Sequence, residues 1–295
     1  MKLRPLNRIA GSLLFGALTL SAITAFAGDL PEIKKAGVLR HIGIPYANFV
    51  TGSGDGMDVE IIQLFAKQLG VKYEYVKGDW GTVVEDLIGK KVKAKGEEVE
   101  FGESVPVKGD LIANGFTILP WRKKAVDFSS PTFPSQIWLI ARADSKMRPI
   151  KSTKSLEKDI ALTRALLKEK KLLALPKTCL DPAGNKLDAT GAEVVIFNGN
   201  LNELAPALVN NEAELTILDV PDALIGLEKW PGKIKIIGPT SGRQEMGVAF
   251  PKDSPQLKAA FNEFFKKIRK DGTYNRIVKK YYPTVHSYFP EFFNK

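Results

Sequence analysis

The strongest constraint on the fold is an alternation of short apolar segments with amphipathic segments along most of the 295-residue chain. VLRHIGI (38–44) and VKYEYV (71–76) have the composition of strands. Between them, in residues 57–70, apolar side chains recur at helical spacing: Val59, Ile62, Phe65, Ala66 and Leu69. Residues 80–91 are also helix-like, which completes a βαβα unit. This order predicts an α/β fold.

A second series of alternating segments follows residues 146–158, a lysine- and serine-rich stretch with the composition of a connection. Helix-like and strand-like segments alternate from residue 159 to 237, and the chain ends in a helix pair at 254–282. Two such clusters predict two lobes. Residues 92–108 alternate partly between apolar and charged side chains, and they predict a surface hairpin inserted in the first lobe.

The first 27 residues differ from the rest of the chain. Lys2, Arg4 and Arg8 precede an apolar run that ends in Ala-Phe-Ala at position 27. This order is typical of a secretory signal peptide, and it predicts cleavage after Ala27 and a location in the periplasm. The alternative is an uncleaved anchor helix, because the run is nearly long enough to span a bilayer.

The composition excludes several classes of protein. A content of 44% hydrophobic and 26% charged residues is that of a soluble globular protein. Without the three basic residues of the leader, 40 of the 43 Lys and Arg remain against 33 Asp and Glu, a net charge of +7. These basic residues are scattered, which indicates solvated faces rather than a nucleic-acid surface. Cys179 is the only cysteine, so no intramolecular disulfide and no zinc site built on cysteine pairs is possible, and His41 and His286, the only histidines, form no local ligand pair. No metal and no cofactor are expected.

The stretch GDLIANGFTILPWRKKAVDFSSPTF (109–133) carries a candidate anion-binding residue. It begins as a buried strand and continues through Gly115 and Thr117 to Arg122. A guanidinium just past a strand end, preceded by a glycine and a hydroxyl, is suited to bind an anion. From these residues alone, however, a surface arginine paired with Asp127 or a nearby acid is the simpler interpretation.

Four blocks of the chain resemble the bacterial extracellular solute-binding proteins of family 3, the amino-acid receptors of ABC importers. In the order of the family they are GMDVEIIQLFAKQLGV (56–71), the stretch 109–133, ELTILDVPDAL (214–224) and IRKDGTYNRIVKKYY (268–282). Met57 departs from the aromatic or aliphatic residue that is usual in the first block. The resemblance covers essentially the whole chain after residue 27, and it identifies the chain as a member of this family.

This resemblance implies an α/β, two-lobed periplasmic binding protein of type II, with a ligand cleft that closes by hinge motion. Lobe one would comprise residues 28–139 plus 242–295, and lobe two residues 140–241. The two crossovers would lie around Ile140–Arg142 and Pro239–Ser241.

By the same resemblance, three residues of the stretch 109–133 bind the head group of the ligand. Arg122 would pair with the α-carboxylate, because its planar fork of donors matches two oxygens. Thr117 would contribute its hydroxyl and backbone, and Gly115 would let the backbone approach closely. An ordinary strand threonine remains the alternative for Thr117.

Lobe two would supply the opposite pole of the site. Asp219 matches the aspartate that binds the α-amino group, although an N-cap of the following helix uses the same residue type. Thr178 and Cys179 stand in the turn that holds the carboxylate from lobe two, with Lys177 in place of the usual glycine. No histidine is nearby in sequence, so Cys179 is expected to line the pocket or be buried, rather than to act as a nucleophile.

Two aromatic residues, Tyr46 and Trp80, match positions that flank the side chain of the ligand. Core packing is the alternative for any aromatic residue, and it is the preferred interpretation for Phe49. Members that bind lysine or arginine often carry an aspartate shortly before this tyrosine. This chain has Gly43-Ile44-Pro45 there, which favours a neutral, polar or aromatic ligand over a strongly basic one.

The resemblance therefore implies a monomeric periplasmic receptor, not an enzyme, that captures a small zwitterion, an L-amino acid or a related carboxylate. Its partner would be an ABC permease in the inner membrane, and no nucleic acid is expected. Two alternatives remain open. One is a cyclohexadienyl dehydratase-like enzyme on the same fold, which needs a general acid such as Asp181 or Asp219. The other is a ligand-sensing partner of a receptor.

Overall fold

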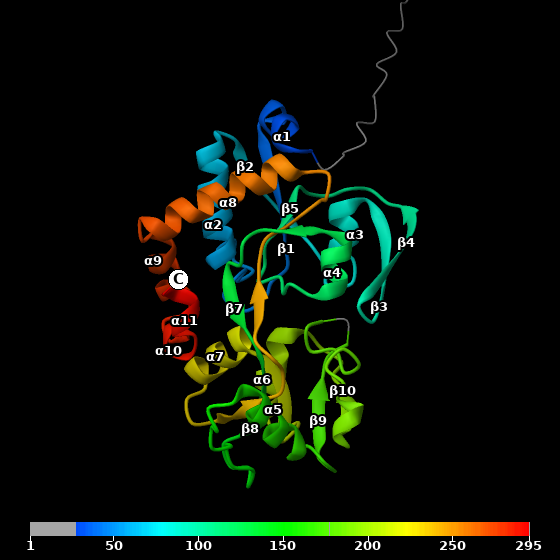
Figure 1. Ribbon diagram of the computed structural model, residues 1–295, viewed down its shortest axis with the longest axis vertical. Helices are drawn as coiled ribbons and strands as arrows, with labels where there is room; N and C mark the ends of the chain where they lie inside the picture. Colours follow the sequence, from blue (N-terminus) through cyan, green and yellow to red (C-terminus); the bar gives the residue numbers. More distant parts are fainter. Residues whose placement is uncertain (1–27, 177, 295) are drawn as a thin grey trace, which may run out of the picture.

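The computed structural model describes residues 28–176 and 178–294. These residues form two lobes, one above the other in Figure 1, and the chain passes between them twice. The two-lobed α/β architecture expected from the sequence is confirmed. The predicted signal peptide, residues 1–27, lies outside the described residues. Across the described ranges, no helix has both the length and the apolar character needed to cross a membrane.

Lobe one is built on a five-stranded sheet with the order β2-β1-β5-β14-β6. β1 is parallel to β2 and β5, and β14 is antiparallel to β5 and β6. The strands are β1 (Val38–Gly43), β2 (Lys72–Lys77), β5 (Leu111–Ile112), β6 (Asp127–Phe128) and β14 (Ala249–Phe250). The helices are α1 (Leu30–Ala36), α2 (Met57–Leu69), α3 (Val83–Ile88), α4 (Pro120–Ala125), α8 (Pro255–Lys270), α9 (Thr273–Tyr281), α10 (Val285–Tyr288) and α11 (Pro290–Phe293).

Lobe two has a second five-stranded sheet, with the order β10-β9-β11-β8-β12. β9 is parallel to β10 and β11, and β8 is antiparallel to β11 and β12. The strands are β8 (Ile137–Arg142), β9 (Lys171–Ala174), β10 (Glu193–Ile196), β11 (Leu215–Asp219) and β12 (Ile234–Pro239). The helices are α5 (Leu156–Ala165), α6 (Leu204–Val209), α7 (Val220–Lys229) and the short 3-10 turns η1 (Asp188–Thr190) and η2 (Leu201–Glu203).

An antiparallel strand pair connects the lobes: β7 (Phe133–Ser135) with β13 (Gln244–Met246). After the first crossing the chain forms β8 in lobe two, and after the second it forms β14 in lobe one. Each of these strands is the fourth in the order of its sheet. From the sequence, we expect the crossovers around Ile140–Arg142 and Pro239–Ser241. Residues 140–142 are in the centre of the second sheet, and Pro239 pairs there with Trp138.

Helix α2 illustrates how the sequence pattern determines packing. Val59, Ile62, Phe65 and Ala66 are buried, as the helical spacing predicts. The helix ends at Gly70, which has φ 73° and donates its N–H to the carbonyl of Ala66. This left-handed conformation favours glycine, so the residue type fixes the end of the helix.

The segment expected to form a hairpin contains two antiparallel strands, β3 (Lys90–Lys95) and β4 (Glu98–Ser104). Val92 and Val99 pack against a small apolar cluster that also includes Trp121 of α4. Glu98 in addition forms an ion pair with Lys124 of α4. The hairpin therefore packs against the helix that carries Arg122.

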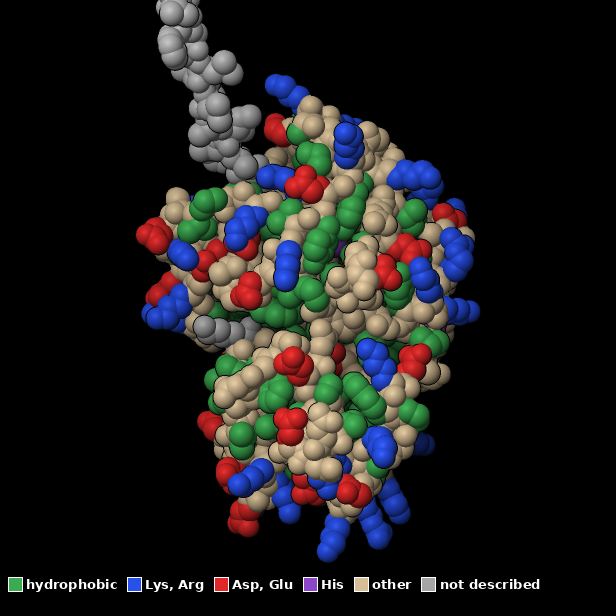
Figure 2. Space-filling view, turned by 180° about the vertical axis from the view of Figure 1, so that it is seen from behind, with side chains coloured by type: hydrophobic (Ala, Val, Ile, Leu, Met, Phe, Trp, Pro, Cys, Tyr) green, Lys and Arg blue, Asp and Glu red, His purple; other side chains and the backbone are tan. Residues whose placement is uncertain are grey.

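Basic and acidic side chains are interspersed over both lobes on the face seen in Figure 2. The hydrophobic side chains on this face are mixed with polar ones. Such a distribution is that of ordinary solvated surface, in which charges of both signs alternate.

Candidate functional site

Loops that follow parallel strands meet at the boundary between the lobes. In lobe one, the loops after β1 and β5 carry Tyr46 and Thr117. In lobe two, Cys179 lies in the turn after β9, and Asp219 ends β11. Ligands of open α/β sheets bind at the carboxyl ends of the strands. The topology therefore brings residues of the candidate site together from both lobes.

Arg122 lies in α4 and is only 3% exposed. One guanidinium nitrogen, Nη1, donates to the Thr117 carbonyl at 3.0 Å, and Cζ lies 3.9 Å from the centre of the Phe116 ring. The buried Nε has no hydrogen-bond acceptor among the described residues. Burial lowers the pKa of Arg122 to about 10. The guanidinium thus remains charged at neutral pH and has a donor to offer to an anion.

The alternative of a surface pair between Arg122 and Asp127 is wrong. The carboxylate of Asp127 binds Lys252 at 3.4 Å and also Lys258. Arg122 is buried instead, and no carboxylate of the described residues forms an ion pair with it. A buried charge without a counter-ion is costly, so this arginine is not explained by surface solvation.

Asp219 is fully buried on the side of lobe two. Its Oδ2 accepts hydrogen bonds from the Tyr46 hydroxyl of lobe one and from the Cys179 thiol, whose sulfur lies at 3.2 Å. Its Oδ1 accepts from the Asp222 N–H at 3.5 Å, so the side chain also caps α7. Burial raises the pKa of Asp219, and these hydrogen bonds partly offset that rise. No lysine or arginine of the described residues neutralises this carboxylate.

In the turn after β9, the Thr178 hydroxyl forms its hydrogen bonds within the turn. Thr178 donates its hydroxyl to the Leu175 carbonyl at 2.8 Å, and the same oxygen accepts from the Leu180 N–H at 3.0 Å. Cys179 is half-buried, and burial together with the charge of Asp219 raises the pKa of its thiol well above the usual value. The thiol is therefore a protonated donor to Asp219, and the side chain of Thr178 stabilises the turn.

Aromatic rings form one wall of the boundary. Tyr46 is buried and lies edge-to-face with Trp80, at 5.6 Å between ring centres. Trp80 in turn stacks on Phe116, at 6.4 Å. Phe49 is fully buried and packs on Tyr46 and Phe133, as core packing requires. Through Phe116, the aromatic series reaches the guanidinium of Arg122.

Gly115 has a structural reason to be glycine. Its φ is 64°, and a Cβ built on it would lie 2.3 Å from the Phe49 ring. Its N–H donates to the buried carboxylate of Asp58 at 2.7 Å. Burial raises the pKa of Asp58 to about 7. This glycine therefore fixes the loop between β5 and Thr117 against the core.

Two further residues at the boundary were not singled out from the sequence as site residues. Asn202 of η2 accepts from the Ala47 N–H at 2.8 Å and donates to the Pro45 carbonyl at 3.2 Å, so it binds lobe one on both sides of Tyr46. Asp222 is 6% exposed, and its Oδ2 has no hydrogen-bond partner among the described residues. The sequence shows Asp222 only as a second acid at the start of a helix, and it gives no signal for Asn202.

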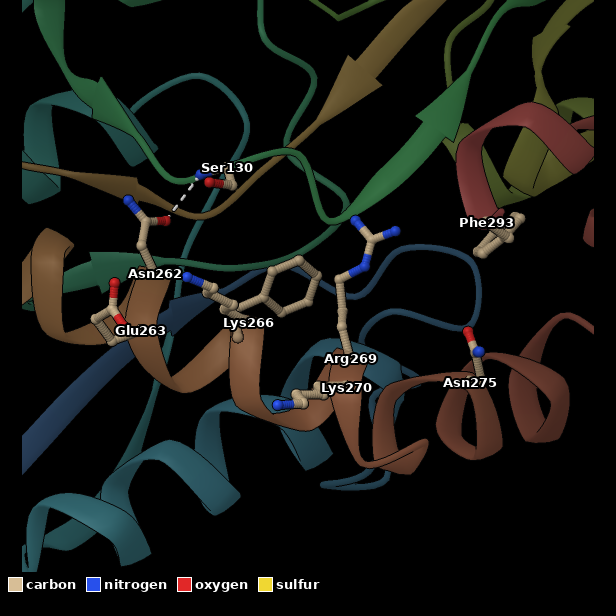
Figure 3. Close-up of a pocket in the computed structure, with 9 residues that line it drawn as sticks. Ser130, Asn262, Glu263, Lys266, Arg269, Lys270, Asn275 and Phe293 are labelled. Atoms are coloured by element: carbon tan, nitrogen blue, oxygen red, sulfur yellow. Dashed lines mark hydrogen bonds between the residues drawn. The ribbon is translucent and has the colours of Figure 1, made fainter. Parts of the chain in front are cut away.

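Two cavities lined by described residues lie outside the Arg122–Asp219 region, and the second of them is lined in part by Asn202 and Asp222. A cavity of about 480 Å³ lies on lobe one, where Lys266, Arg269 and Lys270 of α8 line it together with Phe293 (Figure 3). Basic residues in the last turn of a helix complement its dipole, so they need no ligand. A second cavity of about 200 Å³ lies between the lobes. Within the described ranges, no group of three or more His, Cys, Asp or Glu side chains is arranged to hold a metal ion.

Comparison with known proteins gives a consistent result. Residues 43–284 match the bacterial extracellular solute-binding proteins, family 3. The histidine-binding periplasmic protein of Salmonella typhimurium is 24% identical over 280 residues, which cover 90% of this chain and 96% of that protein. The lysine/arginine/ornithine-binding periplasmic protein of Escherichia coli is 26% identical over 286 residues, which cover 93% and 95%.

A solved structure supports the same fold. It is that of an ancestral amino acid-binding protein described as a precursor of cyclohexadienyl dehydratase. The TM-score is 0.64 at 25% identity, with 86% of this chain and 98% of that chain covered.

Proposed function

Because the chain belongs to the bacterial extracellular solute-binding proteins of family 3, we propose that it captures an L-amino acid in the periplasm by closing its two lobes on the ligand. One observation carries the proposal. Arg122 on lobe one and Asp219 on lobe two are both buried at the boundary, and neither has an ionic partner among the described residues. A zwitterion offers one carboxylate and one ammonium, so it neutralises both poles.

The roles of the individual residues follow from their chemistry. Arg122 binds the α-carboxylate, and Thr117 lies next to it in the loop that precedes α4. Asp219 takes the α-ammonium in place of the Tyr46 hydroxyl. The turn at Thr178 and Cys179 contributes backbone donors and the thiol rather than the threonine hydroxyl, which is engaged within the turn. Gly115 acts indirectly, because it positions the loop that carries Thr117.

The side chain of the ligand is proposed to lie against Tyr46 and Trp80 and to be neutral, polar or aromatic. The aromatic wall favours such a side chain, and the residues before Tyr46, Gly43-Ile44-Pro45, provide no carboxylate for a distal cation. This preference separates the chain from its relative that is named for binding lysine, arginine and ornithine.

We further propose that the protein works as a monomer and delivers its ligand to an ABC permease of the inner membrane. Export would follow from the expected signal peptide, residues 1–27. No bond is made or broken. The ligand must bind the closed form better than the open one, and a micromolar dissociation constant would correspond to about −8 kcal/mol.

A same-fold enzyme is the second candidate, and one observation favours it. Burial raises the pKa of both Asp219 and Asp222, which favours a protonated carboxyl in this pair at the boundary. A general acid needs such a group. Turnover of prephenate or arogenate by the purified protein would support this candidate, and lack of turnover by a protein that binds an amino acid would exclude it for these substrates.

The test of the proposed function is a melting-temperature screen against the amino acids and small organic acids, followed by calorimetric titration of the positive compounds. A ligand at 100 times its dissociation constant adds about 2.7 kcal/mol of stability, which is easily detected. A neutral L-amino acid should give the largest shift. An equal or larger shift with lysine or arginine would refute the neutral preference, and no shift with any amino acid would refute amino-acid capture.

A further inference from the structure

The cavity of about 200 Å³ between the lobes is separate from the proposed amino-acid site. Its wall on lobe one is the loop 47–51, which follows Tyr46, and its wall on lobe two is formed by η2, α6 and α7. Neither Arg122 nor Asp219 lines it. Figure 1 shows α7 at the top of lobe two, facing lobe one. Since both lobes contribute walls, the cavity exists only while the lobes are closed.

Asp222 is the one acidic side chain that lines this cavity among the described residues. It is 6% exposed, and no described residue forms a hydrogen bond with its buried Oδ2. Burial raises the pKa of Asp222, and the negative charge of Asp219 raises it further. A buried acceptor that lacks a donor costs free energy, and a positively charged donor would recover it.

The amides and the hydroxyl that line the cavity are already engaged. Asn48 donates its side-chain amide to the Tyr281 carbonyl at 2.8 Å, and Asn202 uses both of its amide atoms on the loop of Tyr46. The hydroxyl of Thr51 donates to Asp55. Among the lining side chains of the described residues, Asp222 is the one whose fully buried oxygen lacks a hydrogen-bond donor.

The rest of the lining decides which kind of cation fits. Val50 and Ile225 are apolar, and Trp230 adds an indole. Hard metal cations require several oxygen ligands, which one carboxylate with apolar neighbours does not provide. An alkylammonium ion matches better, because its N–H groups bind a carboxylate and its carbon atoms contact apolar and aromatic surface. The exposed Lys229 lies at the same cavity and its charge lowers the pKa of Asp222, but burial and Asp219 raise that pKa more, so a cation that binds to this carboxylate must also displace its proton.

We propose that this interlobe cavity is a second binding site, which takes a small organic ammonium ion on Asp222 and forms only in the closed conformation. Such a cation stabilises closure. By linkage it also raises the affinity of the protein for any ligand that requires the closed form. The cavity thus provides heterotropic control of ligand capture, and its existence does not depend on the identity of the first ligand.

The experiment uses the full protein without its leader and methylammonium chloride as the cation, against sodium chloride at matched ionic strength. Methylammonium should raise the melting temperature more than sodium does, and saturating methylammonium should lower the dissociation constant of a bound amino acid at least about fivefold. Asp222→Asn should abolish both effects. Glu228→Gln removes an exposed acid of the same helix and should leave both effects intact.

A second measurement covers the case in which Asp222→Asn folds poorly. Trp230 lines the cavity, so methylammonium should change the tryptophan fluorescence of the wild type, and Trp230→Phe should lose that change. No stabilisation beyond that of sodium would overturn the proposal; this is also the result expected if Lys229 itself folds onto Asp222. The proposal is equally overturned if Asp222→Asn keeps the full effect while Asp219→Asn loses it, because the cation would then bind at the amino-acid site.

Discussion

Replacement of Arg122 by methionine tests the central charge of the proposed site. Methionine keeps most of the apolar contact with Phe116 and removes the guanidinium. The variant loses the hydrogen bond to the Thr117 carbonyl, which costs about 1–3 kcal/mol if that carbonyl stays unpaired, and a cation–π contact of about 0.5–2 kcal/mol. It also removes a buried charge that has no counter-ion among the described residues, which is favourable.

These effects oppose each other in the ligand-free protein, so its melting temperature should change little. Ligand binding has no such compensation. Each hydrogen bond to a charged group contributes about 1.5–3 kcal/mol, so loss of a bidentate arginine–carboxylate pair removes about 3–6 kcal/mol. At 1.4 kcal/mol for each factor of ten, the dissociation constant should rise by about 10²–10⁴.

The measurement is calorimetric titration of Arg122→Met with the amino acid that the screen identifies, beside a melting curve without ligand. Lys123→Met is the matched control, because it removes an exposed cation from the adjacent position of the same helix. Arg122→Lys should bind weakly as well, because lysine keeps the charge but lacks the planar fork. Affinity of Arg122→Met within threefold of the wild type would refute the carboxylate role of Arg122.

Three further predictions concern residues of the same region. Asp219→Asn should weaken amino-acid binding by about 2–5 kcal/mol without loss of the fold, which titration and melting curves will show; near-normal affinity would contradict its role. Gly115→Ala should lower the free energy of unfolding, measured in urea, by about 2–4 kcal/mol, because the φ of Gly115 is 64° and an added Cβ would clash with Phe49. Gly242→Ala is the control and should cost little, because no heavy atom lies within 4 Å of a Cβ added there. The pKa of Asp58 is about 7 in the folded protein against 3.8 ordinarily, so the contribution of Asp58 to the free energy of unfolding should fall as the pH rises from about 4 to 7. Asp58→Asn should remove this pH dependence from the unfolding free energy. If the variant keeps the pH dependence of the wild type, Asp58 is not its source.

The fold class was predictable because periodicity is a local property of the chain. The spacing of the apolar residues in α2 correctly predicts its buried face, and Gly70 correctly predicts its end. The positions of the crossovers were not predictable in the same way. The apolar run of β8 has the same pattern whether it connects lobes or lies in a sheet, and only its pairing with β11 and β12 decides.

The residue types of the candidate site were predictable, but their mutual contacts were not. Tyr46 and Asp219 are 173 residues apart, and no local pattern indicates that they share a hydrogen bond. Thr178 was expected in a turn that holds the carboxylate of the ligand, and the structure shows that its hydroxyl forms hydrogen bonds within this turn. Asp222 became notable only because its Oδ2 has no hydrogen-bond partner in the part of the chain that the structure describes. The ligand roles of these residues stay predictions until binding is measured.

Different contacts between the lobes affect how readily the lobes close and which ligand they bind. Asn202 binds Ala47 and Pro45, and Tyr46 between them binds Asp219. At about 0.5–1.5 kcal/mol for each hydrogen bond, these contacts raise the closed population, and ligand affinity increases in proportion to that population. In the proposed complex an ammonium replaces the Tyr46 hydroxyl on Asp219, and it brings the buried carboxylate an opposite charge that the hydroxyl does not have. The bonds of Asn202 are unaffected by that exchange. In this proposal Asp219 selects a protonated amine, while Asn202 sets how readily the lobes close around it.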